Sequence, residues 1–365
     1  MNRFYYYLIA ATMISNIVAS VPGILLAESR NGAILSMVLA VIAGMVIIYT
    51  TTYFFNQFPG KDLPELMKEY TSKWLTYPIL LYFALSWFVA GLITFIAYVF
   101  LLITFLTPEM SIYVIAFSLA IIVSIGILIK TESVLYSAEI VLMLSSPLFI
   151  FLMFKSYSND KLDWDFVKVS IMHVNEFPSY DAFTASLYFF MGVVNLIIFN
   201  SVFTKKQKIG AKHLITIGFS GAFILFTTYF IPIGISGFDG IENLLYPWIS
   251  TSDSLRMKYG IIERVVFIFL LFFLAVSIIS ILIHWHVSLK LFCSIFHFKR
   301  LKWKDKNLTP YFFVIMFGVC GIVLSRVLTA YQLLEYSRFF FNLLPTVFAI
   351  ILISLFAVKR GMKSQ

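Results

Sequence analysis

Few residues of this chain could do enzymatic chemistry, and none stands in a recognisable catalytic pattern. His284 and His286 flank Trp285, and residues two apart on a helix do not share a face, so they are poor candidates for metal ligation. No nucleophile-plus-base motif and no phosphate-binding loop of the ATPase type occurs. The sequence therefore predicts neither an enzyme nor an ATP-driven pump, and it implies no metal or other cofactor.

Ionisable residues inside apolar runs are a second source of chemistry, because a charge in hydrocarbon is costly and usually functional. Glu139 could take part in proton coupling or form a satisfied contact near Lys130, and the contact is favoured. Glu263 and Arg264 open a later apolar run, which favours a structural ion pair or interfacial anchoring. Ser277 in that run could face the first apolar run. Its hydroxyl could coordinate Na⁺ there, and the alternative is a hydrogen bond to the backbone of its own helix.

The composition explains why polar candidates are so few. Of 365 residues 61% are hydrophobic and 12% are charged, against about 25% charged in soluble domains. The net charge of +9 comes from basic residues in short loops rather than from one basic domain, so the expected partner is a lipid bilayer and not nucleic acid. Cys293 and Cys320 lie in or beside apolar runs, where we expect ordinary packing.

Ten apolar segments can be drawn, which predicts one transmembrane domain over residues 1–365. An even number places both termini on one side, and the loops on that side hold 17 of the 27 Lys and Arg residues, so both termini are predicted to be cytoplasmic. The first segment partly resembles a signal peptide, but it stays apolar past Pro22 and is expected to be retained. The segments are 4–27, 33–56, 76–106, 109–129, 134–154, 182–203, 213–235, 260–296, 309–328 and 339–358.

The first and sixth segments are interrupted. In the first, Pro22 cannot donate a backbone hydrogen bond, and Ser15 and Asn16 can satisfy the groups that a break frees. In the sixth, Gly192 is a weak point and Asn195 follows it. Interrupted segments in corresponding positions of two halves indicate a transporter-like binding site at the midplane.

The fold class predicted is an all-α integral membrane protein of ten transmembrane helices, built as a five-plus-five inverted repeat with interrupted helices 1 and 6. Because five is odd, the second half must enter the membrane from the opposite side. The parts are a first repeat 4–154, an external loop 155–181, a second repeat 182–358 and a cytoplasmic tail 359–365.

Two connections carry further predictions. Residues 59–70 have helical spacing of apolar residues, and Asp62 with Glu65 resembles a capping box, so we expect a short interfacial helix, with partner docking as the alternative. Residues 236–258 could form a lid over an external vestibule or an interfacial hairpin.

Four stretches, taken in order, carry a family resemblance over nearly the whole length. They are Phe58-Pro59-Gly60-Lys61 with Leu63-Pro64-Glu65-Leu66 and Lys73-Trp74-Leu75; Phe190-Met191-Gly192 followed by Lys205-Lys206; Tyr246-Pro247-Trp248-Ile249-Ser250 with Ile262-Glu263-Arg264; and Leu343-Leu344-Pro345 with Lys359-Arg360. The chain resembles the B subunit of endospore germinant receptors, the spore germination permease family within the amino acid–polyamine–organocation superfamily.

The chain departs from this family at the predicted site. Glycines that members often have around the helix-one break are replaced by Ser15-Asn16-Ile17. Val194 stands where an acidic residue is often found, and Phe273 where a tryptophan is common. The site is therefore less charged than in many relatives, which leaves freed backbone groups, rather than a carboxylate, to bind a zwitterionic amino acid.

The resemblance implies a receptor subunit in the spore inner membrane, which binds a small nutrient such as an amino acid and signals to an A subunit and a lipoprotein C subunit. Alternatives are a proton-coupled amino acid transporter and a scaffold with a vestigial pocket. The predicted pocket lies between helices 1, 3, 6 and 8. Its expected lining is Ser15, Asn16, Ile17, Ala19, Trp87, Gly91, Phe190, Gly192, Asn195 and Ser277, with Pro22, Glu139, Glu263 and Arg264 in structural or coupling roles.

Overall fold

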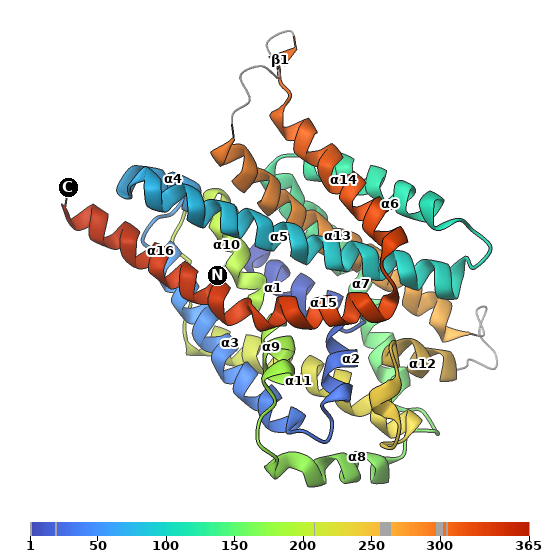
Figure 1. Cartoon of the computed structure of the whole chain (residues 1–365). Coiled ribbons are helices and arrows are strands. Elements are labelled where there is room, and N and C mark those ends of the chain that lie inside the picture. The colour runs from blue at the N-terminus through green and yellow to red at the C-terminus, as the bar shows by residue number, and fades with distance from the viewer. Residues whose placement is uncertain are drawn as a thin grey trace.

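The computed structural model describes residues 2–18, 20–207, 209–255, 264–296, 302–303 and 306–364, and these are mostly helical (Figure 1). Helices are expected for so apolar a chain, because a segment in lipid must satisfy its backbone groups internally. Within the described ranges the sheet structure is a single antiparallel pair, in which β1 (Lys302–Trp303) runs against β2 (Lys306–Asn307).

Seven helices of the described chain are long and apolar enough to cross a membrane, or up to nine if each of two bent pairs is one span. This confirms the predicted multi-pass helical membrane protein. A shorter apolar helix, α6 (Ile112–Ile127), accompanies them. The seven are α3 (Ala33–Phe55), α5 (Lys73–Leu101) with the π-helical η1 (Leu102–Leu106), α7 (Thr131–Tyr157), α11 (Ala211–Ser236), α13 (Val265–Ile295), α14 (Thr309–Val327), and α15 (Ala330–Asn342) joined to α16 (Leu344–Ser364).

The first bent pair consists of α1 (Arg3–Ser15) and α2 (Ser20–Ala27), which meet at 57°. The break lies upstream of Pro22, which the sequence had suggested as its cause. Pro22 is the third residue of α2, in the first turn, where backbone N–H groups have no partner within the helix. Pro22 therefore belongs to the start of the second half-helix and does not itself interrupt the first.

The second bent pair joins α9 (Tyr180–Tyr188) to a segment at 54° that begins beside Gly192. This segment is built of tight and regular turns in succession: η3 (Met191–Asn195) is a 3₁₀-helix, α10 (Leu196–Phe199) is α-helical, and η4 (Asn200–Val202) is 3₁₀ again. A 3₁₀ stretch inside a span often marks a functional hinge. Both bends thus fall in the segments whose interruption the sequence predicts.

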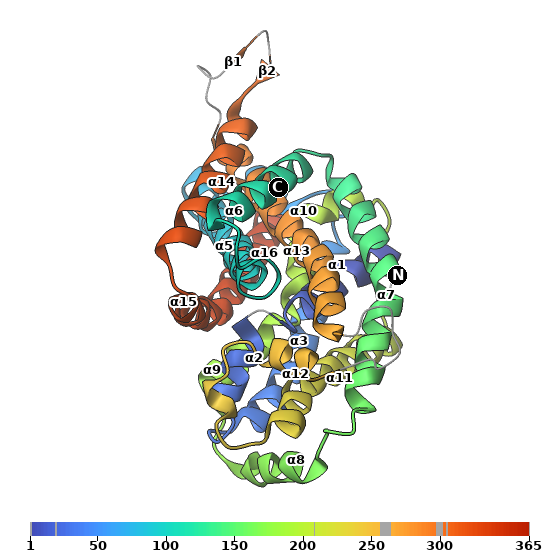
Figure 2. The same cartoon turned by 90° about the vertical axis from the view of Figure 1, so that its right-hand side faces the viewer.

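The long helices α5 and α13 pack along each other through the centre of the molecule, and α15 crosses the outer side of the bundle against α5 and α9 (Figures 1 and 2). The contact between α5 and α13 is aromatic, because the Trp285 ring stacks on Phe95 at 5.5 Å and on Phe88 at 6.2 Å. Gly91 faces Trp285 so closely that a side chain there would overlap the indole. These two helices form the rigid wall behind the candidate site.

Both chain termini lie at the same end of the bundle. The Asn2 N–H donates to the Gln207 side chain (2.6 Å), and α16 packs against α4 (Leu63–Tyr70). The predicted capping box of α4 is confirmed, because the Glu65 N–H donates to Asp62 (2.9 Å) and the Glu65 side chain accepts from the Asp62 backbone. Burial raises the pKa of the Asp62 carboxyl to about 6.

The opposite end is covered by short helices. The predicted external loop carries α8 (Trp164–Ile171) and η2 (Met172–Asn175), and residues 236–255 form η5 (Ile241–Asn243) and α12 (Pro247–Ser254). Trp248 is buried and its indole N–H donates to the Thr228 carbonyl (3.1 Å), while α12 packs on α11 and α13. This segment is therefore packed onto the bundle, which disagrees with an interfacial hairpin anchored by Trp248.

Candidate functional site

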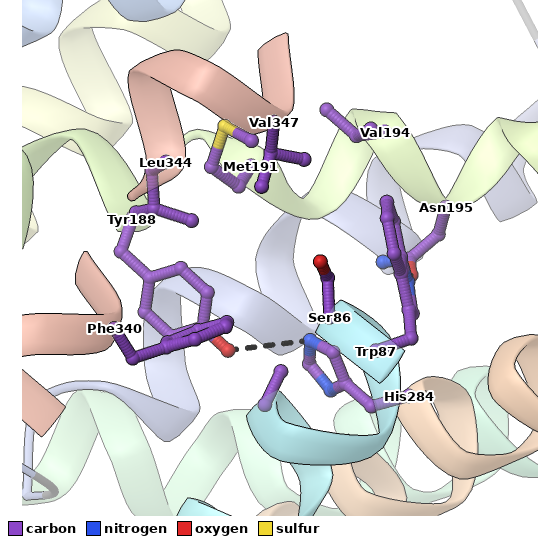
Figure 3. A pocket seen from close by; sticks show the side chains of 11 residues that line it. Ser86, Trp87, Tyr188, Met191, Val194, Asn195, His284, Phe340, Leu344 and Val347 are labelled. Atoms are coloured by element: carbon purple, nitrogen blue, oxygen red, sulfur yellow. Dashed lines mark hydrogen bonds between the residues drawn. The ribbon is translucent and has the colours of Figure 1, made fainter. Parts of the chain in front are cut away.

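A small cavity lies at the second helix break, lined by three spans and the junction of α15 with α16 (Figure 3). Its free space is about 30 Å³, which is room for water alone, since one water needs about 10–15 Å³ by the same measure. None of the described side chains around it belongs to Asp, Glu, Lys or Arg. The lining residues are Ser86, Trp87, Ala90, Tyr188, Met191, Val194, Asn195, His284, Phe340, Leu344 and Val347.

Trp87 and Asn195 form the polar pair on one side of this cavity. The Trp87 indole N–H donates to Asn195 Oδ1 (2.6 Å), and Asn195 Nδ2 donates to the Gly192 carbonyl (3.0 Å). An indole nitrogen only donates, so the amide oxygen must face it and the amide nitrogen must face the carbonyl. Asn195 therefore connects the helix break to α5 in one fixed orientation.

His284 and Tyr188 form the polar pair on the other side (Figure 3). His284 Nδ1 lies 2.7 Å from the Ser280 carbonyl oxygen, which can only accept, so Nδ1 carries the proton. His284 Nε2 is then an acceptor in the neutral ring, and it lies 3.4 Å from the Tyr188 hydroxyl. The lone pair of His284 Nε2 therefore faces the cavity and accepts a hydrogen bond from the Tyr188 hydroxyl. A ligand with a donor group could replace that hydroxyl.

Of the residues predicted to line the pocket, Trp87 and Asn195 do so. Gly192 instead lies where η3 crosses α1, and a Cβ there would lie 2.6 Å from the Leu8 carbonyl oxygen and 2.8 Å from Ile9 Cα. Phe190 is buried and fills the space beside two glycines of α3 and α11. Gly192 and Phe190, like Gly91, therefore hold the wall of the site together without facing its interior.

The predicted residues of the first break also lie away from the lining. Ser15 Oγ (3.1 Å) and Asn16 Nδ2 (2.6 Å) both donate to the Thr12 carbonyl, and Ile17 is buried in the core. Ala19 lies outside the described residues. Ser277 is buried on α13 but is not part of the lining. No described residue of α1 or α2 reaches this cavity, whereas α15 and α16, which were not predicted to contribute, do so.

Two of the charged residues singled out from the sequence, Glu139 and Arg264, make ion pairs away from the cavity. Glu139 Oε1 lies 2.9 Å from Arg3 Nε, so α7 is joined to the start of α1 rather than to Lys130. Arg264 Nε lies 3.8 Å from Oδ1 of Asp253, which is in the last turn of α12. Glu263 is outside the described residues, which contain no group of three or more His, Cys, Asp or Glu placed to hold a metal ion.

Tyr188, His284 and Phe340 are lining residues that sequence patterns did not single out. His284 sits in an uninterrupted apolar run, where a lone histidine is usually a satisfied core residue. Tyr188 lies directly before the stretch that holds the second break, and this position was the one feature of the sequence that could have indicated it as a lining residue. Phe340 contacts Tyr188 edge to face at 6.3 Å.

Taken together, the fold and site define a multi-pass helical membrane protein in which two bent spans cross beside a small uncharged cavity. A family model described as spore germination protein matches residues 2–332, and the chain belongs to that family. It is a permease-like and receptor-like family rather than a family of enzymes. No curated protein sequence matches the chain significantly. The matched region ends within α15, before Phe340, Leu344 and Val347.

Proposed function

We propose that this protein is the nutrient-sensing B subunit of a spore germination receptor in the spore inner membrane, with both termini cytoplasmic. It binds a small nutrient such as an amino acid in the cavity between α5, η3, α13 and the α15–α16 junction. The observation that carries this proposal is the hydrogen bond from Trp87 to Asn195, which places a half-helix break directly at an uncharged cavity.

The ten-span inverted repeat belongs to this proposal. Counting each bent pair as one span and adding α6 gives ten, and the two bends come at the start of each half. The two bent spans also cross each other where Gly192 meets Leu8 and Ile9. Within the described residues, the end that holds both termini carries most of the Lys and Arg residues, which supports a cytoplasmic orientation.

The size of the cavity implies that nutrient binding changes its shape. The free space holds water only, so a bound amino acid must separate at least one of the two polar pairs. A ligand can shift a protein between two states only by its different affinity for them. The closed cavity therefore corresponds to the resting receptor, and the bound nutrient favours a wider state with η3 displaced.

A chain of hydrogen bonds can transmit the displacement of η3 to the end of the molecule that holds both termini. Asn200, in η4 beyond the break, donates through Nδ2 to the carbonyl oxygens of Phe58 (2.8 Å) and Lys61 (2.7 Å). The Gly60 N–H donates to the Phe203 carbonyl (3.0 Å). Movement of η3 and η4 must therefore move the segment that leads into α4.

This connection favours signalling over simple transport, because α4 presents polar residues at the surface. Its exposed Glu69 is paired with Lys61 at 2.5 Å, and Lys68 bonds the Ser294 carbonyl. We propose that α4 signals to the A subunit, and that the C subunit belongs to the same assembly.

The transporter remains a second candidate because of His284. It is a titratable residue whose Nε2 faces the cavity beside Tyr188, and such a group can accept a proton together with a solute. Proton-coupled uptake by this chain alone, in vesicles without partner subunits, would be the signature of that function.

The test is germination of spores that carry Asn195→Leu, compared with a deletion and the unaltered chain, across single amino acids, nucleosides and sugars. We expect loss of response to one nutrient, normal response to the others, and normal protein level in the membrane. An unchanged profile in the deletion would refute the receptor function, and solute flux in vesicles of the purified protein would support the transporter.

A further inference from the structure

A long apolar groove lies on the outer side of the molecule, between α5, α14 and the α15–α16 pair. The space that a water-sized group can occupy there is about 570 Å³, against about 30 Å³ in the central cavity. Apart from one serine and two tyrosines its lining is aliphatic or phenylalanine. The residues are Tyr82, Leu85, Ser86, Val89, Leu92, Ile93, Ile96, Leu324, Leu328, Leu333, Tyr336, Phe339, Phe340, Leu343 and Val347.

The groove faces outward from helices that cross the membrane. Leu85 is 48% exposed on α5, and Tyr336 and Phe339 are 56% and 66% exposed on α15. α15 lies on the outside of the bundle next to α5 and α14 (Figure 2). An apolar recess of this kind does not hold water, and a bilayer leaves no empty space against a protein. Something hydrophobic must therefore fill it.

The width of the groove distinguishes between hydrophobic occupants. From Tyr82 to Ile96 it follows roughly 21 Å of α5 at 1.5 Å per residue. Its whole free volume, open side included, is about 1270 Å³, and a cylinder of that volume and length would be about 9 Å wide. An α-helix with side chains is about 10–12 Å across. A helix of another subunit could therefore lie over the groove but would not fit inside it, whereas a hydrocarbon chain would.

The groove also shares part of its wall with the central cavity. Ser86, Phe340 and Val347 line both spaces, so these side chains form the partition between them. Phe340 is 8% exposed and contacts Tyr188, which in turn contacts His284. An occupant of the groove would thus press on the wall of the cavity.

We propose that this groove binds one acyl chain of a membrane phospholipid, with its length along α5 and its side against Phe340. The proposal requires only that the chain spans a bilayer, and it does not depend on the receptor function. Its consequence is that the lipid and the contents of the cavity influence each other through Phe340.

The test uses the full-length protein in vesicles of phosphatidylglycerol and phosphatidylethanolamine that contain a trace of phospholipid with a photoreactive group on one acyl chain. After illumination, labelled peptides are mapped by mass spectrometry. We expect labels concentrated at residues 82–96 and 333–347. Equal labelling of all lipid-facing helices would overturn the proposal.

Two substitutions sharpen this test. Leu85→Trp places a large ring in the groove and should lower the labelling of its walls at least fivefold, whereas Leu144→Trp, at a 76% exposed position on α7, should leave it unchanged. If Leu85→Trp does not fold, Val89→Phe takes its place. Labelling of the groove walls that survives the Leu85→Trp substitution would contradict the proposal. Labelling that is lost only when partner subunits are present would also contradict it, and would indicate that a partner helix occupies the groove.

Discussion

The two helix breaks of this protein look alike in sequence but differ in what they bond. At the first, Ser15 and Asn16 both donate to the Thr12 carbonyl one turn back, and Ser20, after the break, donates to the Ser337 hydroxyl of α15 (2.7 Å). At the second, Asn195 bonds the Gly192 carbonyl and also accepts from Trp87 of another helix. Both breaks thus share a polar side chain with a neighbouring helix, but Asn195 of the second break lines the central cavity and Ser20 of the first does not. The second break can therefore form a site, whereas the first is a bend.

The largest effect is expected where the two bent spans touch. A Cβ on Gly192 would meet backbone atoms of Leu8 and Ile9, which cannot rotate away, so Gly192→Ala should force α1 and η3 apart. Overpacking of this kind costs about 1–3 kcal/mol or more. We expect a clear fall in the melting temperature of the purified protein and loss of the nutrient response. Gly318→Ala is the control, because its nearest neighbour, Ala120 Cβ, lies 3.7 Å away; equal melting temperatures would contradict the tight crossing.

Removal of the shared side chain should affect function next most strongly. Asn195→Leu leaves the buried Trp87 N–H without an acceptor, at a cost of about 1–3 kcal/mol in stability. A double-mutant cycle with Trp87→Phe should give a coupling energy above about 0.5 kcal/mol in thermal unfolding. Additive effects of the two substitutions would show that Asn195 and Trp87 are not coupled and would contradict a shared site at this break.

Tyr188→Phe tests the other pair of the cavity with a smaller change. It removes the hydroxyl 3.4 Å from His284 Nε2 and keeps the ring that packs on Phe340. We expect stability to change by less than about 1 kcal/mol, because a single neutral hydrogen bond is worth about that much. The nutrient concentration for half-maximal germination should shift about threefold or more in the same spores, and an unshifted value would remove Tyr188 from the site.

Ser15→Ala and Asn16→Ala should have small effects, since each residue bonds only its own helix. Two donors share one carbonyl at Thr12, so either can be lost at about 1 kcal/mol or less. We expect normal germination with both variants. Loss of the germination response with either variant, while the protein is present in the membrane at its normal level, would show that the first break is functional.

The smallest effect concerns pH and α4. The pKa of Asp62 is raised by burial to about 6, so the folded protein binds more protons than the unfolded chain between about pH 4 and 6. Stability should therefore increase as pH falls through 6. Asp62→Asn keeps a capping side chain and removes this titration, so its melting temperature should vary less between pH 7 and pH 5 than that of the unaltered protein.

The bends could be predicted from sequence because they depend on local chemistry. Gly192 and the polar side chains of Ser15, Asn16 and Asn195 are weak points in an apolar run, and Pro22 marks the first turn of the next half-helix. The lining of the cavity could not be predicted in the same way, since it depends on which helices cross. His284 looks like any core histidine until α9 places Tyr188 against it, and α15 reaches the site only because the last span is itself divided near Leu343.

The paired polar groups of the closed cavity also set a limit on sensitivity. In the proposed receptor, a nutrient that enters must replace at least one of the Trp87–Asn195 and Tyr188–His284 hydrogen bonds before its own contacts count. At about 1 kcal/mol for each bond lost, the apparent dissociation constant rises roughly fivefold for one bond and roughly 30-fold for both, relative to an open site with the same contacts. Such a receptor would ignore traces of its ligand and respond only when the nutrient is abundant.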